Sequence, residues 1–363
     1  MHGLPLALGA LTPLILALSV SHGWATEAGE LAAEATLPEQ RCQRVLRDLE
    51  QPPNGRHGAG KAVEIRLNLH VLDILAVDDA AGTFTGDVLM FVSWNDPRFA
   101  DREISQQIRG CELQRGQLWE PPLHLANGYD SSTVPVDPLA VSATGVVSYR
   151  ERIRATFSTR FDLHDFPFDR QSFEIAVIST APSDLVRFGS TIDFRDGQFA
   201  SVGWRFSNPM ATNSSYEQPY GIGDPRNRQV PLAIFSFEGH RRAEFYLWRI
   251  VLPLCLIVAM SWSVFWIHSS ELGTQMSVSS ASVLTLIAFQ ISLTDMLPAV
   301  PYLTRLDAFA LTATVLVFAA LAESVSSSWL VRRNKVALAE LIDRSSRIVF
   351  PAAFVAVIAV LSL

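Results

Sequence analysis

The sequence is poor in charge, in cysteine and in basic residues. Charged side chains make up 18% of the 363 residues, whereas an average soluble domain carries about 25%. Lys and Arg number 29 against 36 Asp and Glu, which argues against a nucleic-acid-binding protein, because such a protein needs a basic face to neutralise phosphates. Three cysteines exclude a small domain built on disulfides, and 49% hydrophobic residues exclude a disordered chain.

Common catalytic motifs are also absent. The sequence contains no H-E-x-x-H, G-x-S-x-G or C-x-x-C pattern, so a zinc protease, a serine hydrolase and a dithiol redox site are not indicated. Residues 55–61 imitate a phosphate-binding loop, but Ala62 stands where Ser or Thr is required, and a strand pattern follows where a helix is needed. We therefore expect no enzyme activity, no cofactor and no metal site.

The shortage of charge is confined to the second half of the chain. From Phe245 to the C-terminus, 119 residues contain 6 acidic and 7 basic side chains, whereas the preceding residues contain 30 and 22. Four apolar segments in this half each approach the roughly 20 residues that cross a bilayer as a helix. They occupy about residues 245–267, 274–297, 306–330 and 341–363. The sequence thus predicts a four-helix transmembrane domain over residues 244–363.

Two signals indicate the direction of insertion. The apolar run from Leu4 to Val20 precedes small residues at Gly23 and Ala25, a pattern typical of a signal peptide over residues 1–25; an uncleaved anchor helix is the alternative. The expected loop over residues 331–347 is basic, and basic loops face the cytoplasm. Its basic side chains are Arg332, Arg333, Lys335, Arg344 and Arg347. Both signals predict a bacterial inner-membrane protein whose N-terminal domain and C-terminus are periplasmic.

The first half of the chain has the sequence pattern of β-strands. Apolar residues alternate with other residues from Val63 to Val71, which predicts a half-buried strand over residues 61–77. Further β-rich runs cover residues 85–94, 145–158, 172–180 and 230–237, and residues 40–50 suggest a short leading helix. Many short strands separated by Pro and Gly predict an antiparallel β-sandwich over residues 38–243. The expected fold class is therefore a β-sandwich followed by a helical membrane domain.

A series of short motifs is similar to that of one protein family. Residues 166–171, Phe-Pro-Phe-Asp-Arg-Gln, resemble the Pro-loop of the pentameric ligand-gated ion channels, the Cys-loop receptor superfamily. Arg241 stands twelve residues before Pro253, as the pre-helix arginine stands before the first-helix proline. Other matching segments lie in the same order at residues 94–98, 118–121, 273–298, 297–302 and 346–351. The resemblance covers residues 40–363 and implies a homopentameric channel in a lipid bilayer.

The cysteines depart from the pattern of this family. Thr159 and Phe173 occupy the positions of the cysteine pair that brackets the Pro-loop in other members. This replacement and a short connection between the third and fourth helices are typical of prokaryotic members. Cys42 and Cys111 would face an oxidising periplasm, and whether they pair is open from the sequence. Cys255 lies in an expected membrane helix.

The second membrane segment is expected to line the pore. Alignment on the family gives one helical face, because its members are spaced by alternating steps of four and three. The lumen positions are Ser277, Ala281, Leu284, Ala288, Ile291 and Asp295, with Glu271 just beyond the cytoplasmic end. In a pentamer, Leu284 and Ile291 would form apolar rings that close by dewetting, and rings of Glu271 and Asp295 would favour monovalent cations.

Two observations leave this interpretation of the pore open. The many hydroxyls of the segment could pack against other helices instead of facing water. The cytoplasmic glutamate of cation-conducting members aligns at Gly273 or Thr274, which carry no charge. Glu271 would therefore have to substitute from the preceding turn.

The resemblance also implies a coupling region where the two halves meet. It places Asp79, Asp169 and Arg241 in three loops at the membrane-facing end of the sandwich, where one guanidinium can serve two carboxylates. Three unrelated surface charges are the alternative. Phe166 and Pro167 belong to the Pro-loop, and Pro298 and Pro301 stiffen the connection that follows the pore helix.

The ligand site is the least defined part. The positions of the aromatic cage that binds amines in this family are here Leu89, Ala126 and Thr180, none of them aromatic. Tyr129, Tyr216 and Tyr220 lie nearby and could compensate, or they could be ordinary loop residues. Arg150, Arg152 and Arg154 share one strand face, which would suit either salt bridges between subunits or a carboxylate ligand. Crowded acidic residues also permit gating by protons.

The sequence therefore predicts a cation channel gated by a small molecule or by protons. Two other classes of protein are alternatives. A non-conducting, membrane-anchored periplasmic sensor would explain the sandwich but not a hydroxyl-rich helix with charges only at its ends. A secondary transporter would have internal repeats and broken helices, which the sequence lacks.

Overall fold

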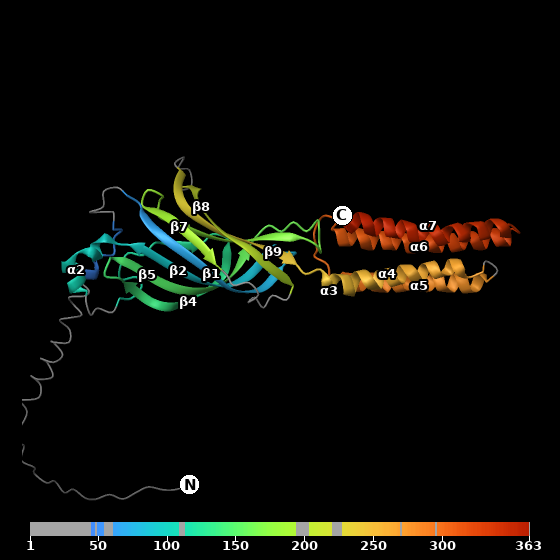
Figure 1. Cartoon of the computed structure of the whole chain (residues 1–363), viewed down its shortest axis with the longest axis horizontal. Helices are drawn as coiled ribbons and strands as arrows, with labels where there is room; N and C mark the ends of the chain where they lie inside the picture. Colours follow the sequence, from blue (N-terminus) through green and yellow to red (C-terminus); the bar gives the residue numbers. More distant parts are fainter. Residues whose placement is uncertain are drawn as a thin grey trace, which may run out of the picture.

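The computed structural model describes residues 45–47, 49–53, 61–108, 113–193, 203–219, 227–268, 271–294 and 296–362. A β domain and a bundle of helices follow one another along the long axis of the molecule (Figure 1). Several expectations lie outside the described residues: the signal peptide over residues 1–25, part of the helix expected at residues 40–50, and the side chains of Cys42, Cys111, Tyr220 and Asp295.

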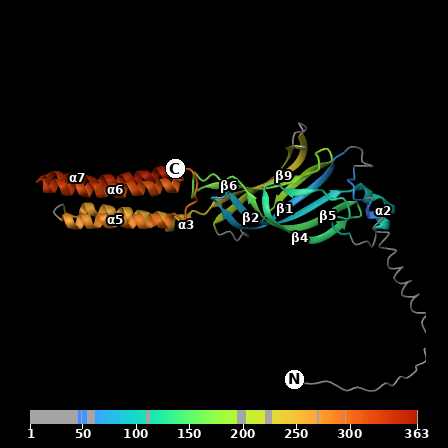
Figure 2. The same ribbon diagram turned by 180° about the vertical axis from the view of Figure 1, so that it is seen from behind.

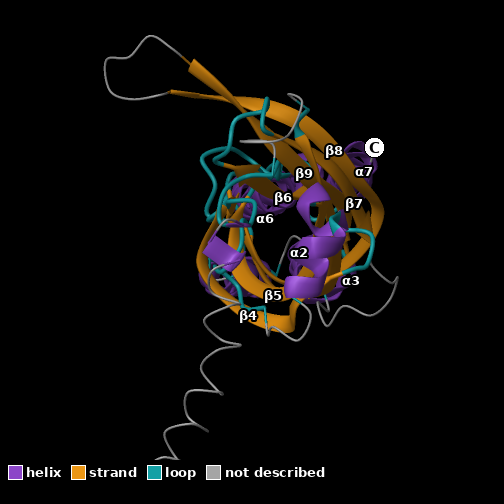
Figure 3. Ribbon diagram, turned by 90° about the vertical axis from the view of Figure 1, so that its left-hand side faces the viewer, coloured by secondary structure: helices purple, strands orange, loops and turns teal. Residues whose placement is uncertain are grey.

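Within the described residues, nine strands form the β domain as two sheets. One sheet has the order β4-β5-β2-β1-β7 and the other the order β3-β6-β9-β8. Their bounds are β1 Val63–Asp78, β2 Thr83–Asn95, β3 Leu123–Leu125, β4 Gly128–Val141, β5 Val146–Ser158, β6 Arg170–Ser179, β7 Val186–Asp193, β8 Trp204–Pro219 and β9 Asn227–Arg241. Viewed from the end far from the helices, the strands curve around a common core (Figure 3). The predicted sandwich is thus confirmed.

Side-chain alternation builds this core. Along β1, every second residue from Val63 to Val71 is buried, and the residues between are exposed or half-buried. Aromatic rings fill the space between the sheets: Phe84 of β2 lies 5.2 Å from Phe157 and 5.1 Å from Phe173, centroid to centroid. Burial of such large apolar surfaces supplies most of the stability of a sandwich.

One strand pair corrects the expectation of a purely antiparallel sandwich. β7 runs parallel to β1, from the pair Val63–Val186 to the pair His70–Asp193. The chain leaves β6 in one sheet and enters β7 at the edge of the other sheet. This crossover lets β7 run in the direction of β1, whereas a hairpin would have forced the antiparallel pairing.

The end of the sandwich far from the helices carries a short helical segment. A 3₁₀ turn, Pro97–Ala100, leads into α2, Arg102–Gln107 (Figure 2). Arg98 donates hydrogen bonds to the fully buried carboxylate of Asp96 at 2.6 and 2.9 Å and to main-chain oxygens of Leu49 and Gln51. Asp96 and Arg98, in the matching segment 94–98, therefore hold Leu49 and Gln51 against this end of the sheet.

The second half is helical. The first span runs from Glu244 to Trp266 through α3 Glu244–Tyr246, a π-helical turn Leu247–Val251, α4 Leu252–Ser263 and a 3₁₀ turn Val264–Trp266. It is followed by α5 Leu272–Leu293, α6 Arg305–Arg332 and α7 Val336–Ser362. Among the described residues, the first span, α5 and α6 are each long and apolar enough to cross a membrane. α7 packs against α6 as the fourth helix of the bundle.

The basic segment expected as a loop over residues 331–347 is helical except for a tight turn. α6 continues to Arg332 and α7 begins at Val336, so the turn comprises residues 333–335, with Asn334 at a φ of 58°. The expectation rested on charge, but Ala, Leu, Glu and Arg are all good helix formers. These charged residues therefore form the end of α6, the turn and the start of α7.

The packing of Gly239 in β9 generates a test of the core. A Cβ added to this residue would lie 2.4 Å from Cε2 of the buried Phe173 ring. We expect Gly239→Ala to lower the free energy of unfolding by about 1–3 kcal/mol, because overpacking forces a buried ring out of its position. Gly189→Ala in the edge strand β7 is the control, since its Cβ would meet only the Glu64 carboxylate at 3.3 Å. Equal melting temperatures for the two variants would contradict this packing.

Candidate functional site: the domain junction and the exposed face of α5

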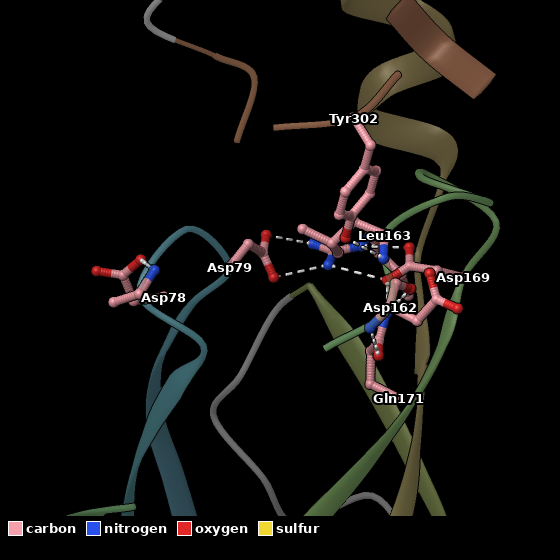
Figure 4. A network of polar contacts seen from close by, with 9 residues as sticks. Asp78, Asp79, Asp162, Leu163, Asp169, Gln171 and Tyr302 are labelled. Carbon is pink, nitrogen blue, oxygen red and sulfur yellow. Dashed lines mark hydrogen bonds and ion pairs between the residues drawn. The ribbon is translucent and has the colours of Figure 1, made fainter. Parts of the chain in front are cut away.

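Arg241 joins three segments where the β domain meets the helices. Its Nε donates to Oδ1 of Asp169 at 2.7 Å, and its Nη1 and Nη2 donate to the Asp79 carboxylate at 2.8 and 2.7 Å. The side chains of Arg241 and Asp169 are only 4% and 1% exposed. Figure 4 shows Asp79 approaching from one side and Asp169 from the other. Asp79, Asp169 and Arg241 therefore lie in direct contact at the end of the β domain that faces the helices.

The surroundings of Arg241 keep it charged. Its guanidinium lies 4.2 Å from the Trp204 ring centroid and 4.7 Å from that of Phe166. Burial by itself would lower the pKa of Arg241, but the hydrogen bonds to Asp79 and Asp169 outweigh it and hold the pKa above its usual value. A buried charge of this kind is stable only while its partners stay in place.

The Pro-loop is closed by side-chain amides and hydroxyls instead of a disulfide. Gln171 donates through Nε2 to the Asp162 main-chain oxygen and to Oδ2 of Asp169, both at 2.6 Å, and its Oε1 accepts from the Asp162 N–H at 3.0 Å. Thr159, at one former cysteine position, donates to the Ser172 oxygen at 3.0 Å. Phe173, at the other, is fully buried in the core.

The closed Pro-loop contacts the start of α6 and the connection before it. The hydroxyl of Tyr302 accepts from the Leu163 N–H at 3.1 Å, as Figure 4 shows, and the Tyr302 ring stacks on His164 at 4.1 Å. The N–H groups of Arg305 and Leu306 donate to the His164 and Phe166 oxygens at 2.9 and 3.2 Å.

Apolar burial accompanies these bonds. Leu163 and Phe166 are fully buried, and they belong to the same apolar cluster as Ile250, Leu254 and Leu306 of the helices. Pro167, next to Phe166, is buried as well. The Pro-loop therefore packs into the top of the helical bundle and does not merely rest on it.

The connection between α5 and α6 lies beneath this loop. It contains both prolines of the sequence prediction: the Pro298 oxygen accepts from the Val300 N–H at 3.0 Å, and Pro301 is exposed. Thr304 then caps α6 through a reciprocal pair of bonds with Asp307. The fixed φ of each proline and the capped start of α6 limit the backbone conformations that this connection can adopt.

α5 has two different faces. Ser277, Ala281, Leu284, Ala288 and Ile291, the described members of the expected stripe, are all exposed, with Leu284 at 69% and Ile291 at 70%. The opposite face, at Gln275, Ser279, Ser282, Leu286 and Leu293, is buried against the other helices. Within one chain, nothing described covers the stripe.

The hydroxyls of α5 divide between these faces. Ser279 donates to Oγ of Ser324 on α6 at 3.0 Å, and Gln290 donates to Oγ1 of Thr314 at 2.5 Å, so these groups pack helices together. Ser277 and Thr285 are exposed and donate to main-chain oxygens of the preceding turn. The hydroxyls of the buried face therefore pack helices together, whereas Ser277 and Thr285 on the exposed face bond within α5.

Glu271 lies directly before α5 and is exposed. Its main-chain oxygen accepts from the Gln275 N–H at 3.1 Å, so it occupies the first turn position at the helix start. The family's glutamate aligns at Gly273 or Thr274, inside the first turn of α5. Glu271 precedes these two residues in the structure, as it does in the sequence. Asp295, at the other end, is not among the described residues.

The expected ligand positions lie on two different sheets. Leu89 is in β2, opposite Arg152 of β5, whereas Ala126 and Thr180 lie at the ends of β3 and β6 and Tyr216 is in β8. Tyr129 is the second residue of β4 and is exposed. Among the described residues, no group of three or more His, Cys, Asp or Glu side chains could hold a metal ion.

The three arginines of β5 have carboxylate partners in their own chain. Arg150 binds Asp137 of β4, and Arg152 and Arg154 both bind Asp87 of β2, at 2.6 and 3.1 Å. The hydrogen bond from Arg152 holds the pKa of the buried Asp87 below its usual value, against the opposing effect of burial. Sequence reasoning missed both carboxylates; an aspartate inside the apolar run of β2 was the available signal.

Comparisons with known proteins cover both halves of the chain. Residues 40–184 match the neurotransmitter-gated ion-channel ligand binding domain, and residues 250–337 match the neurotransmitter-gated ion-channel transmembrane region. The chain is 25% identical over 304 residues to a proton-gated ion channel of Gloeobacter violaceus, covering 82% of this chain and 81% of that protein. It is 23% identical over 278 residues to a glutamate-gated chloride channel of Drosophila melanogaster, covering 75% and 60%.

The Arg241 cluster leads to a stability prediction. We expect Arg241→Ala to lower the free energy of unfolding by about 3–5 kcal/mol, because it leaves two carboxylates without their partner in a buried site. Arg66→Ala is the matched control, since Arg66 forms an exposed pair with Glu64 and such pairs contribute about 0–1 kcal/mol. The measurement is thermal unfolding of purified protein in detergent. A melting temperature for Arg241→Ala within the range of Arg66→Ala would refute the prediction.

Proposed function

Because the chain belongs to the pentameric ligand-gated ion channel family, we propose that it forms a homopentameric, cation-selective channel opened by a ligand or by protons. The observation that carries this proposal is the exposed stripe of α5, from Ser277 to Ile291. One helix cannot enclose a pore, so this face needs further copies of itself to line a lumen. Small and hydroxyl-bearing residues alternate there with two large apolar ones, which suits a hydrated pathway with narrow apolar rings.

The coupling of ligand binding to the pore would pass through the domain junction. Asp79, Asp169 and Arg241 tie the β domain together at its membrane end, and Phe166 and Pro167 pack into the helices. A shift of the Pro-loop would press on Tyr302 and on the connection that carries Pro298 and Pro301. This connection directly follows α5, so movement of the loop would reach the proposed pore helix.

Protons are the agonist that the observations favour. The relative in Gloeobacter violaceus is a proton-gated ion channel, and the front half of this chain holds 30 acidic residues. A carboxylate ligand at Arg150, Arg152 and Arg154 would have to displace Asp137 and Asp87. Asp87 itself is not a suitable sensor, because its lowered pKa keeps it ionised to a lower pH than an ordinary aspartate.

A small-molecule agonist would need two subunits. Leu89 on one sheet and Ala126, Thr180 and Tyr216 on the other could share a pocket only across a subunit boundary. Tyr129 and Tyr216 are exposed and offer aromatic faces for a cation there. Tyr220 completes this set in the sequence. Such a site would bind amines.

We further propose a bacterial inner membrane as the location, with the β domain and the C-terminus in the periplasm. The supporting features are the signal-peptide pattern of residues 1–25 and the basic residues between Arg332 and Arg347. The end of α7 lies on the same side of the bundle as the β domain (Figure 1), in agreement with four crossings.

The decisive experiment is a conductance recording of purified protein in a planar bilayer while the pH is lowered and candidate amines are added. We expect unitary currents and a pentameric mass in detergent. A monomer or dimer as the only species would contradict the channel. Stable pentamers that bind a ligand without passing current would instead support the non-conducting sensor.

Leu284 is expected to form a gate. Leu284→Ser should ease hydration of the closed lumen at five equivalent positions and lower the agonist concentration for half activation by about tenfold, a bias of about 1.4 kcal/mol. Leu311→Ser is the control, because Leu311 is an exposed leucine of α6 outside the stripe. Unchanged activation of Leu284→Ser, with the mutant at the surface, would place the constriction elsewhere.

Selectivity should come mainly from Glu271. Five carboxylates at one level attract cations and repel anions. Asp295 would lie in the wide, hydrated outer mouth, where salt screens its charge within about 10 Å, whereas Glu271 would lie at the narrower end. Glu271→Gln should therefore weaken the preference for cations more than Asp295→Asn, as measured by the reversal potential under a salt gradient. A wild-type reversal near the chloride potential would overturn cation selectivity. A larger shift for Asp295→Asn would instead move the filter to the outer mouth.

A further inference from the structure

A polar cavity lies at the end of the helical bundle far from the β domain. Its volume is about 410 Å³, within the range of small-molecule sites. The cavity is lined by Ile267, His268, Glu340, Asp343, Arg344 and Arg347. It lies between α7 and the end of the first span, so the exposed stripe of α5 does not border it.

Four charged residues of α7 face this cavity together. Glu340, Asp343, Arg344 and Arg347 are spaced by three, one and three residues, which places them on one side of a helix. Two are held by neighbours: Nε of Arg347 donates to the Phe265 oxygen at 2.8 Å, and Oδ1 of Asp343 accepts from Oγ of Ser327 at 2.7 Å. The cavity thus presents both signs of charge from partly fixed positions.

The level of the cavity along the helices is that of a membrane surface. Ile267 directly follows the first span, which ends at Trp266, and Arg347 directly precedes Ile348, where the long apolar run of α7 begins. Trp and Arg commonly mark this boundary, and here the Arg347 guanidinium lies 6.0 Å from the Trp266 ring centroid.

Exposed apolar side chains adjoin the cavity on its membrane side. Trp266, Ile348 and Val349 are all large and exposed. A polar cavity next to such a surface is complementary to a phospholipid, whose headgroup would lie in the cavity and whose acyl chains would lie along the helix. A free phosphate or amine would use only the polar part.

We propose that this cavity binds the headgroup of a phospholipid that carries both a phosphate and a primary ammonium, namely phosphoethanolamine. Arg344 and Arg347 would bind the phosphate with paired N–H donors, and the exposed carboxylate of Glu340 would accept from the ammonium. Asp343 is buried against α6, where it accepts from Ser327. A headgroup with only a phosphate would leave the Glu340 carboxylate without a partner in the cavity. A choline headgroup has the charge but no N–H to donate. The proposal does not depend on conduction, so a failure of the proposed channel function would leave it standing.

The test is native mass spectrometry of the full chain, purified in detergent and incubated with phosphatidylethanolamine, phosphatidylglycerol or phosphatidylcholine of the same acyl chains. Wild-type protein should retain phosphatidylethanolamine about tenfold better than the other two. Arg344→Gln should lower its retention to that of phosphatidylcholine. Glu340→Gln should remove the preference over phosphatidylglycerol while phosphate binding persists. The control is Arg332→Gln, an exposed arginine at the same end that does not line the cavity.

Two results would overturn the proposal. One is equal retention of all three lipids by the wild-type protein. The other is an Arg332→Gln variant that loses as much lipid as Arg344→Gln, since a diffuse charge effect would then suffice. Glu340 and Arg344 are exposed, so both variants should fold, and their melting temperatures check this. If Arg344→Gln did not fold, Glu340→Gln would still decide the outcome, because it should lose the preference for phosphatidylethanolamine over phosphatidylglycerol.

Discussion

The pairing of one buried guanidinium with two carboxylates constrains the whole membrane end of the β domain. Asp79 directly follows β1, Asp169 directly precedes β6, and Arg241 ends β9. β1 belongs to one sheet and the other two strands to the second, so Arg241 ties both layers at a single point. Because an unpaired buried charge is costly, the ends of three strands must meet at this point. The Pro-loop, which contains Asp169 just before β6, is thereby directed at the helices.

The helical half satisfies a different constraint. α5 has to hold the bundle with one face and leave the other free. Its polar groups serve the first purpose where Ser279 and Gln290 bond to α6, which fixes the rotation of the helix about its axis. That rotation in turn decides which side chains stay exposed. Hydrogen bonds between helices thus determine the face that Leu284 and Ile291 present, although neither residue takes part in them.

The sequence patterns identified the interior of each sheet and missed its edges. β1, β2, β5, β6 and β9 were expected, and each has neighbours on both sides; β3, β4, β7 and β8 were not, and all four are edge strands. β4 shows why, since most of its side chains are exposed and it contains Pro135 and Pro138, so no alternation marks it. Arg241 and its partners came from family resemblance, whereas the partners of Arg152 depend on strand register, which spacing along the chain does not reveal.

The start of α6 depends on the other domain for its hydrogen bonds. The N–H groups of Arg305 and Leu306 donate to main-chain oxygens of the Pro-loop. Only the next N–H, that of Asp307, donates to the helix cap at Thr304. The two halves are therefore not interchangeable modules. A chimera that joins this β domain to the helices of a relative must take the Pro-loop and the first turn of α6 from the same parent, because main-chain geometry, and not only side-chain identity, has to match across that seam.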